Sequence, residues 1–157
     1  MRTFKGLGEL SRAFEEAAII HTQALHAAAA VSGAIIKKNV EDTFGDKTKL
    51  AALAQATIDE RTALNLPPDL PLYRTGELLK DSVRERHVGP MATVGSPEPI
   101  MFFHEEGSVN VRAGTSNVPR PVFRIGMEES RPEIEDVILP MALGVTFGGT
   151  GKVVIIP

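Results

Sequence analysis

Apolar and small side chains recur every three or four residues over the first forty positions of the chain. This spacing is typical of an amphipathic helix and predicts one long helix from Gly8 to about Asn39. Glu15 near its start and Lys38 near its end complement the dipole of such a helix. The repeating face consists of Leu7, Leu10, Phe14, Ala17, His21, Ala24, Ala28, Val31 and Ile35.

The most apolar part of this helix, Ala17–Ile36, is interrupted by polar residues such as His21 and Gln23. It therefore makes a poor membrane span, and we expect a buried helix. Within it, Ala27–Ala30 carries almost no side-chain bulk, so another backbone can approach closely. We expect packing within the same subunit, against a sheet, and the alternative is contact with a neighbouring subunit.

Shorter elements follow the long helix. Val40–Lys49 is predicted to be a loop, and a second helix is expected over part of Leu50–Leu64. Thr57 and Glu60 have the spacing of a capping box at the start of that helix; the alternative places Thr57 inside it. Leu66–Pro71 contains three prolines and predicts a stiff, extended connector.

A β-hairpin is expected in the middle of the chain. A short helical turn should follow Gly76, and Ser82–Val88 then alternates as a strand does. Gly89-Pro90 marks a turn, after which Met91–Val94 returns as the second strand.

The second half of the chain predicts helices and strands that alternate with loops. Ile100–Glu106 predicts one or two helical turns, and Gly107 stands where a left-handed residue would end them. Val109–Val118 should be an exposed hairpin or loop. Val122–Ile125 predicts a further strand, and Pro132–Leu143 predicts the last helix, with its proline in the first turn.

Together these elements predict an α+β fold, in which a long N-terminal helix and shorter helices pack on a small antiparallel β-sheet. Residues 1–143 are expected to form one domain. Residues 144–157 read as a glycine-rich spacer followed by a β-like C-terminal arm.

Composition narrows the class of protein. The chain has 157 residues, 43% of them hydrophobic, which is enough for one domain with a real core. It has no cysteine, which excludes disulfides and thiolate metal sites and fits folding in a reducing cytosol. A net charge of −3 argues against general binding of nucleic acid through its phosphates. We see no signal peptide.

No motif for catalysis or cofactor binding is complete. Phe147–Lys152 resembles a phosphate-binding loop but lacks the leading glycine and the final Ser or Thr. His104-Glu105-Glu106 resembles the start of a helical zinc site, but Ser108 stands where the second histidine is needed. Ser96 precedes a proline and does not form a nucleophile elbow. We therefore expect no enzyme, no cofactor and no metal; the alternative is a small metal-dependent hydrolase that uses His104, Glu105 and Glu106.

Several short motifs between positions 53 and 123 occur in an order that is more specific than any one of them. The series starts with Leu53, Thr57 and Ile58, and the proline connector then leads to a Thr-Gly-x-Leu motif. A strand ending in Val-Gly, an aromatic turn ending in Glu-Gly and a Pro-Arg-Pro-Val-Phe segment complete it. The residues that carry the motifs are Thr75, Gly76, Leu78, Ser82, Gly95, Phe103, Glu106, Gly107, Pro119, Arg120, Pro121 and Phe123.

In this order the motifs resemble those of the tail-completion, or head–tail joining, proteins of tailed bacteriophages. The resemblance covers roughly residues 1–143. It departs from the family pattern at Met101-Phe102, where Tyr-Ala is more usual, and in the glycine-rich tail.

The resemblance implies a structural task for each motif. Gly76, Gly95 and Gly107 would supply positive φ or close approach. Pro119 and Pro121 would stiffen the exit from the long loop, and Phe123 would anchor that exit in the core.

The resemblance also implies a place in the virion neck, reached after assembly in the host cytoplasm. The subunits would form a ring, expected to be a hexamer, between the head connector or stopper protein and the tail tube or tail terminator protein. DNA would pass through the ring without specific binding, and no membrane would be involved. The alternative is a cytosolic assembly adaptor or chaperone that is absent from the finished particle.

A ring subunit needs two different contact faces, because head-to-tail contacts are heterologous. The exposed loop and the apolar C-terminal arm are the candidates, since an unpaired apolar strand can add to a partner's sheet. The candidate contact residues are Val109, Val111, Arg112, Val153, Val154, Ile155 and Ile156.

Overall fold

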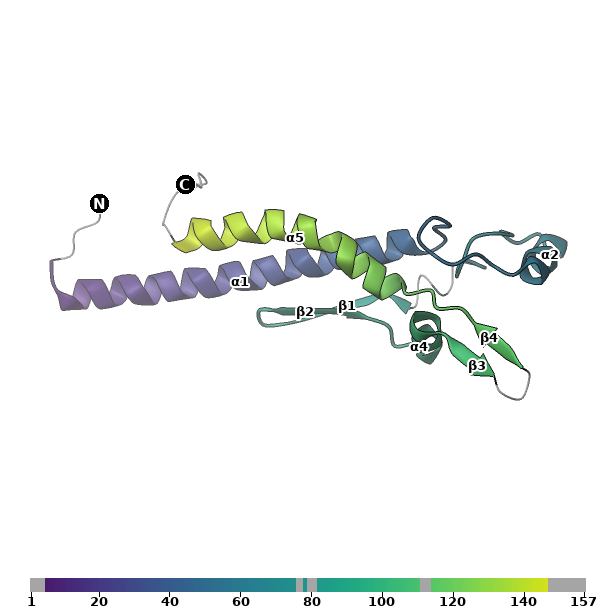
Figure 1. The fold of residues 1–157 in the computed structure, drawn as a ribbon. Helices are drawn as coiled ribbons and strands as arrows, with labels where there is room; N and C mark the ends of the chain where they lie inside the picture. Colours follow the sequence, from purple (N-terminus) through teal and green to yellow (C-terminus); the bar gives the residue numbers. More distant parts are fainter. Residues whose placement is uncertain (1–4, 76–77, 79–81, 111–113, 147–157) are drawn as a thin grey trace.

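The computed structural model describes residues 5–75, 78, 82–110 and 114–146. Within these residues the chain forms four helices and two separate two-stranded antiparallel sheets, labelled as in Figure 1. The predicted α+β class, with a long N-terminal helix, is confirmed.

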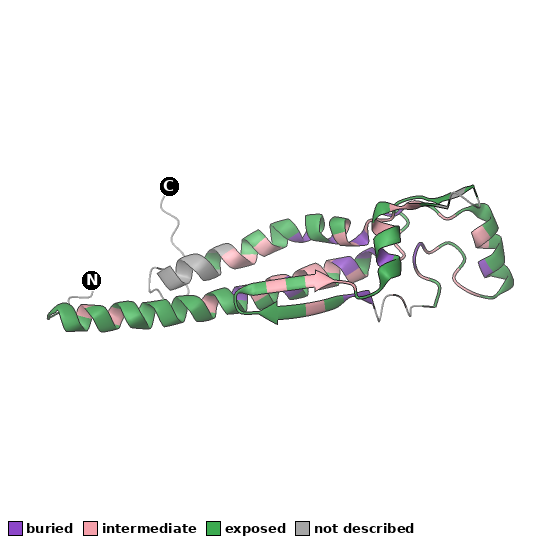
Figure 2. Ribbon diagram, turned by 90° about the horizontal axis from the view of Figure 1, so that it is seen from below, coloured by how far each residue is buried: buried purple, intermediate pink, exposed green. Residues whose placement is uncertain are grey.

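Two long helices and one hairpin form the long axis of the molecule. Helix α1 spans Leu7–Thr43, and α5, Val122–Thr146, runs beside it in the opposite direction (Figure 1). Strands β1, Arg84–Val88, and β2, Met91–Gly95, form the predicted hairpin, which lies along α1 (Figure 2).

The shorter elements gather at the C-terminal end of α1. They are α2, Gln55–Ala63, and α4, Pro99–Glu106, together with a second hairpin of β3, Ser108–Asn110, and β4, Thr115–Asn117. The predicted helix at positions 100–106 and the predicted hairpin at 109–118 are thereby confirmed.

Four predictions about element boundaries were wrong. The loop expected from position 40 begins only after α1 ends at Thr43, because Val40 and Thr43 are fully buried by tertiary packing. The strand expected at 122–125 is the start of α5. Pro132 lies inside α5 rather than in its first turn, and α5 continues to Thr146, into the predicted spacer. Of the two alternatives for Thr57, the second holds: α2 begins after Ala54, so Thr57 lies inside the helix, and no side chain caps its start.

The core lies where the end of α1, the first hairpin, α4 and α5 meet. It contains few large side chains, and the first turns of α1 contribute nothing to it. Its buried members are Val40, Phe44, Leu50, Leu72, Val83, Met101 and Val122.

The backbones of α1 and α5 approach each other closely at Val40 and Gly126. A Cβ added to Gly126 would lie 2.7 Å from both N and Cα of Val40. One turn further along α5, the Ser130 hydroxyl donates to the Gly126 carbonyl at 2.5 Å and accepts from Asn39 Nδ2 at 3.0 Å. Small residues one turn apart on α5 therefore allow this close crossing.

The first hairpin approaches α1 in the same way. A Cβ added to Gly33 would collide with the Glu85 carboxylate and would lie 2.9 Å from the Cβ of Ala92. The sheet of the same subunit therefore packs on α1 at Gly33; of the run Ala27–Ala30, where we expected such a contact, Ala28 is buried whereas Ala27 and Ala30 are exposed. Packing on α1 begins only at Ala28, because nearly all of the preceding helix is exposed.

We expect Gly126→Ala to lower the free energy of unfolding by about 2 kcal/mol, as overpacking in a rigid site does. The contact is with backbone atoms of Val40, so no change of rotamer relieves it. Urea unfolding measures the change. The matched control is Gly8→Ala, in the first turn of α1, where an added Cβ meets nothing within 4 Å. Equal stability of the two variants would contradict the close crossing.

Candidate functional site

Arg120, from the Pro-Arg-Pro motif, joins three segments that are distant in sequence. Its backbone N–H donates to the carbonyl of His104 at 2.6 Å. Its guanidinium donates from Nε to the Ala51 carbonyl and from Nη2 to the Ala52 carbonyl, both at 2.9 Å. The motif arginine therefore holds the loop before α2, the end of α4 and the start of α5 together.

Glu105 satisfies the N-terminus of α5 from another element. Its Oε1 accepts a hydrogen bond from the backbone N–H of Phe123 at 2.5 Å. The first N–H groups of a helix have no partner within the helix, so a carboxylate at this position stabilises α5. Burial raises the pKa of Glu105, although the backbone N–H groups of Phe123 and Arg124 act in the opposite direction.

Gly107 is required by both conformation and space. Its φ is 76°, and an added Cβ would lie 2.8 Å from the carbonyl oxygen of Asn117 and 3.0 Å from Pro119 Cγ. Its ψ of 174° is extended, so it is not the left-handed helical cap that we expected. Gly95 has neither a positive φ nor a neighbour within 4 Å of an added Cβ, so that prediction was wrong. Gly76 lies outside the described residues.

The other motif residues divide between the core and the surface. Ser82 is fully buried and its hydroxyl donates to the Leu78 carbonyl. Phe123 packs against the core but is only half-buried, whereas Val122 beside it is fully buried and is the stronger anchor. The exposed motif residues are Thr75, Phe103, Glu106 and Pro119, and Pro121 is half-buried.

Arg61, on α2, organises the proline connector, and no sequence motif pointed to it. It is 9% exposed, and its Nη1 donates to the carbonyls of Leu70 at 2.8 Å, Tyr73 at 3.3 Å and Pro67 at 3.4 Å. The only signal in the sequence was an arginine placed shortly before a run of prolines, which leave carbonyls without local N–H partners.

An open pocket of about 280 Å³ lies between these arginines. Arg61, Arg74, Arg120 and His104 line it together with leucines and Thr75. Burial lowers the pKa of His104, and the nearby positive charge of Arg120 lowers it further. Arg61 and Arg120 both donate to backbone carbonyls, so in this pocket they hold loops in place.

His104, Glu105 and Glu106 do not converge. His104 faces the arginine pocket, Glu105 binds the start of α5, and Glu106 is exposed. In the part of the chain that the structure describes, no group of three His, Cys, Asp or Glu side chains could hold a metal ion.

Two groups of exposed apolar side chains lie on different elements. The first, which we call the α1 patch, consists of Leu7, Phe14, Ile19, Ile20 and Leu25, which are spread around α1 rather than along one face of it. The second, the α4 patch, consists of Ile100, Phe102 and Phe103 on α4, Val109 on β3 and Val118 after β4. Figure 2 shows the first turns of α1 exposed on the side seen there.

The α1 patch contradicts the expectation of a buried helix. Phe14 is 66% exposed, and α1 extends beyond the end of α5 (Figure 1). Of the predicted contact residues, Val109 is exposed, while Val111, Arg112 and Val153–Ile156 lie outside the described residues.

By length and composition α1 could cross a membrane, and 17% of its most apolar window is buried. Core helices and signal sequences have the same properties, so this test does not identify a membrane protein. The charged hairpin that contains Arg84 and Arg86 lies along the C-terminal half of α1.

Comparisons with known proteins do not identify the chain. No protein-family model matches it, and neither a curated protein nor a solved structure matches it.

We expect Arg120→Met to destabilise the fold by about 2 kcal/mol, because two carbonyls lose a charged donor. Arg120→Lys should not restore stability, since a single ammonium cannot reproduce the arginine fork. Chemical unfolding measures the loss. Arg86→Met, an exposed arginine on β1, serves as the control and should unfold like the wild type. A wild-type midpoint for Arg120→Met would show that the motif arginine does not join these segments.

Stability should also fall as the pH is lowered through about 6.5, the ordinary pKa of histidine. The folded state lowers the pKa of His104, so the unfolded chain binds more protons in this range. His104→Gln should reduce this pH dependence, measured by urea unfolding between about pH 8 and about pH 5. The control, His21→Gln on exposed α1, should keep the wild-type dependence. Identical pH profiles for His104→Gln and the wild type would refute the assignment.

Proposed function

We propose that this chain is a non-enzymatic structural subunit of the bacteriophage neck. It forms a ring, expected to be a hexamer, that completes or terminates the tail and joins it to the head connector. Its neighbours are the connector or stopper protein on one side and the tail tube or tail terminator protein on the other.

The observation that carries this proposal is the set of large apolar side chains that the described residues leave exposed. In this part of the chain the buried hydrophobic core is small, with seven members, and many of the exposed apolar side chains are distributed over α1, α4 and the second hairpin.

Phe14 and Phe102 are each 66% exposed, and Val109 is 74% exposed. Exposed apolar patches of this kind mark interaction sites. The shape therefore supports a role as one unit of an assembly, where contacts with other subunits cover what a monomer leaves open.

Exposed apolar side chains indicate an assembly of some kind. We propose the bacteriophage neck in particular because of the order of the short motifs. Three motif residues hold segments in position. Arg120 joins three segments through its guanidinium and its backbone N–H. Gly107 forms a turn that only glycine fits, and the buried Ser82 hydroxyl donates to the Leu78 carbonyl. Of these, the turn at Gly107 is a task that the resemblance to tail-completion proteins implies, whereas Gly95 does not have the task expected of it. Function in that family requires shape and surfaces for docking.

The competing functions have less support. A metal-dependent hydrolase would need His104, Glu105 and Glu106 to act together, yet they point to different surroundings. A cytosolic assembly adaptor would use the same apolar patches and differs only in being absent from the finished particle.

Purified particles test the proposal. We expect the chain to be present in virions, at the head–tail junction in particle images. A phage that lacks its gene should produce heads and tails that fail to join and should be rescued by the wild-type chain. Native mass measurement should give a closed ring. Normal joined particles without the chain would refute the proposal, and joining that needs a chain absent from virions would favour the adaptor.

A further inference from the structure

We propose that the arginine pocket, which Arg61, Arg74, Arg120 and His104 line, is a binding site for a phosphate group. The pocket lies where α2, the proline connector, the end of α4 and the Pro-Arg-Pro motif meet. This inference goes beyond the proposed role in the bacteriophage neck and does not depend on it.

The pocket concentrates positive charge in a chain that is acidic overall. Arg61 reaches it from α2, Arg74 from the residues after the proline connector, and Arg120 from the segment before α5. No Asp or Glu among the described residues lines it, although the whole chain has a net charge of −3. Three leucines supply apolar walls. A cleft that combines charges of one sign with apolar walls attracts ions of the opposite sign.

The positive groups lie close enough to repel one another. Burial lowers the pKa of Arg120, and the charge of Arg61 lowers it further. Burial also lowers the pKa of His104, and the charge of Arg120 acts in the same direction. An opposite charge between these groups would favour their charged forms. A negative ligand in the pocket would therefore stabilise the arrangement that the loops impose.

Two of the arginines keep donors beyond those that hold the loops. Arg61 is 9% exposed, and every side-chain hydrogen bond that it makes to the described residues comes from Nη1. Arg120 uses Nε and Nη2, so its Nη1 makes none within the same part of the chain. The acceptors are neutral carbonyls, which leave the charge of each guanidinium uncompensated. Because these contacts already fix both side chains, little conformational entropy is lost when an anion binds.

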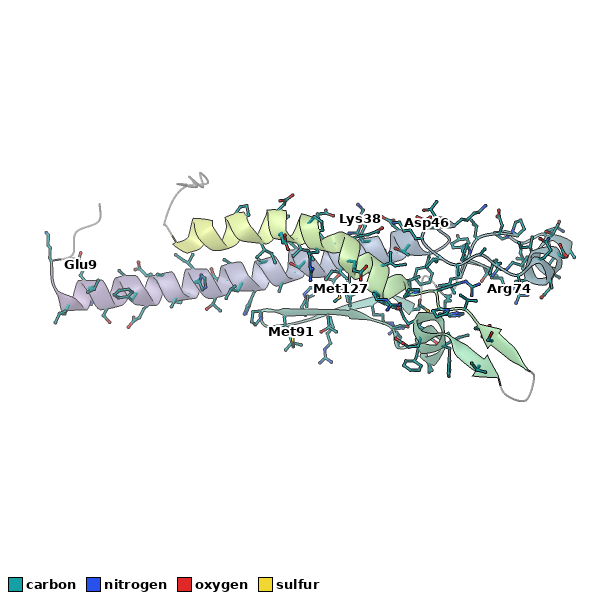
Figure 3. All side chains as sticks on the ribbon, in the orientation of Figure 1. Glu9, Lys38, Asp46, Arg74, Met91 and Met127 are labelled. Carbon is teal, nitrogen blue, oxygen red and sulfur yellow. The ribbon has the colours of Figure 1, made fainter. Side chains whose placement is uncertain are left out.

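Arg74 is the exposed member of the set. Its side chain is 56% exposed, and its Nη2 lies 3.7 Å from Glu60 Oε1, beyond hydrogen-bond distance. Figure 3 labels Arg74 at the end of the molecule where α2 lies, opposite to the end marked by Glu9. A surface ion pair of this kind contributes little, so Arg74 can turn toward a bound anion at small cost.

Charge and size favour phosphate over other anions. Guanidinium groups bind both carboxylate and phosphate in a bidentate geometry. At the same distance a doubly charged phosphate gains about twice the Coulomb energy of a single carboxylate. The pocket volume of about 280 Å³ lies just below the range of roughly 300–1,000 Å³ that is typical for drug-sized ligands, so it suits a small ion.

Titration of the full chain with inorganic phosphate, at constant pH and ionic strength, tests the inference. Imidazole resonances in nuclear magnetic resonance spectra are followed, and a His104→Gln variant assigns the signal of His104. We expect that signal to shift and to saturate, since the imidazole lines the pocket. The signal of His21, on exposed α1, should not move. A His104 signal that does not respond, or that drifts without saturating, would overturn the inference.

A variant at the exposed arginine tests the same site. Arg74→Met should weaken phosphate binding by at least about tenfold, because a charge-assisted hydrogen bond is lost. Arg74→Lys keeps the positive charge and should lose less. The matched control, Arg86→Met on β1, is also exposed but does not line the pocket and should bind as the wild type does. Wild-type affinity in Arg74→Met would contradict the assignment.

Other anions distinguish the alternatives. Acetate should bind more weakly than phosphate, and equal affinity would show a carboxylate site and overturn the choice of phosphate. A short single-stranded oligonucleotide separates free phosphate from a nucleic-acid backbone: tighter binding of the strand that Arg74→Met abolishes would support the inference and identify the backbone as the source. Phosphate binding that appears only in Glu77→Gln would show that a carboxylate of the chain itself fills the pocket, and the inference would be wrong.

Discussion

The crossing of α5 over α1 at Gly126 and Val40 is the constraint on which the rest of the structure depends. Because Gly126 has no side chain, the helices approach until α5 meets the backbone of Val40, and Asn39 and Ser130 then form a hydrogen bond across the same crossing. This contact fixes the direction in which α5 leaves the core. It also brings Val122, at the start of α5, into the core, and with it the Pro-Arg-Pro segment before it.

The contacts of the short motifs depend on that crossing. Once the start of α5 is fixed, Glu105 can bind its free N–H group, and Arg120 can reach the carbonyls of Ala51 and Ala52. Gly107 allows the chain to turn between α4 and the second hairpin where Pro119 packs closely. These are polar contacts that hold loops in place. Arg61 does the same for the proline connector.

A small core and a long helix leave many apolar side chains exposed. The core residues cluster at one end of α1, while the other end carries Phe14, Ile19 and Ile20 into solvent. Apolar side chains in such numbers lower the solubility of a free monomer and become stabilising only when a partner covers them. The same property explains why α1 meets the length and composition criteria for a membrane span although a charged hairpin lies along part of it.

The sequence by itself determined the elements whose signals are local. The 3.6-residue period of α1 and the Gly89-Pro90 turn between two alternating strands both depend on neighbours in the chain. Only the tertiary structure decided where helices end and what they bury. Val122–Ile125 has strand-forming residues, yet it is helical because Val122 and Gly126, one turn apart, both face the core. Likewise, periodicity revealed an apolar face on α1 but not what covers it, because burial depends on segments distant in sequence and, for the first turns of α1, none of the described residues provides it.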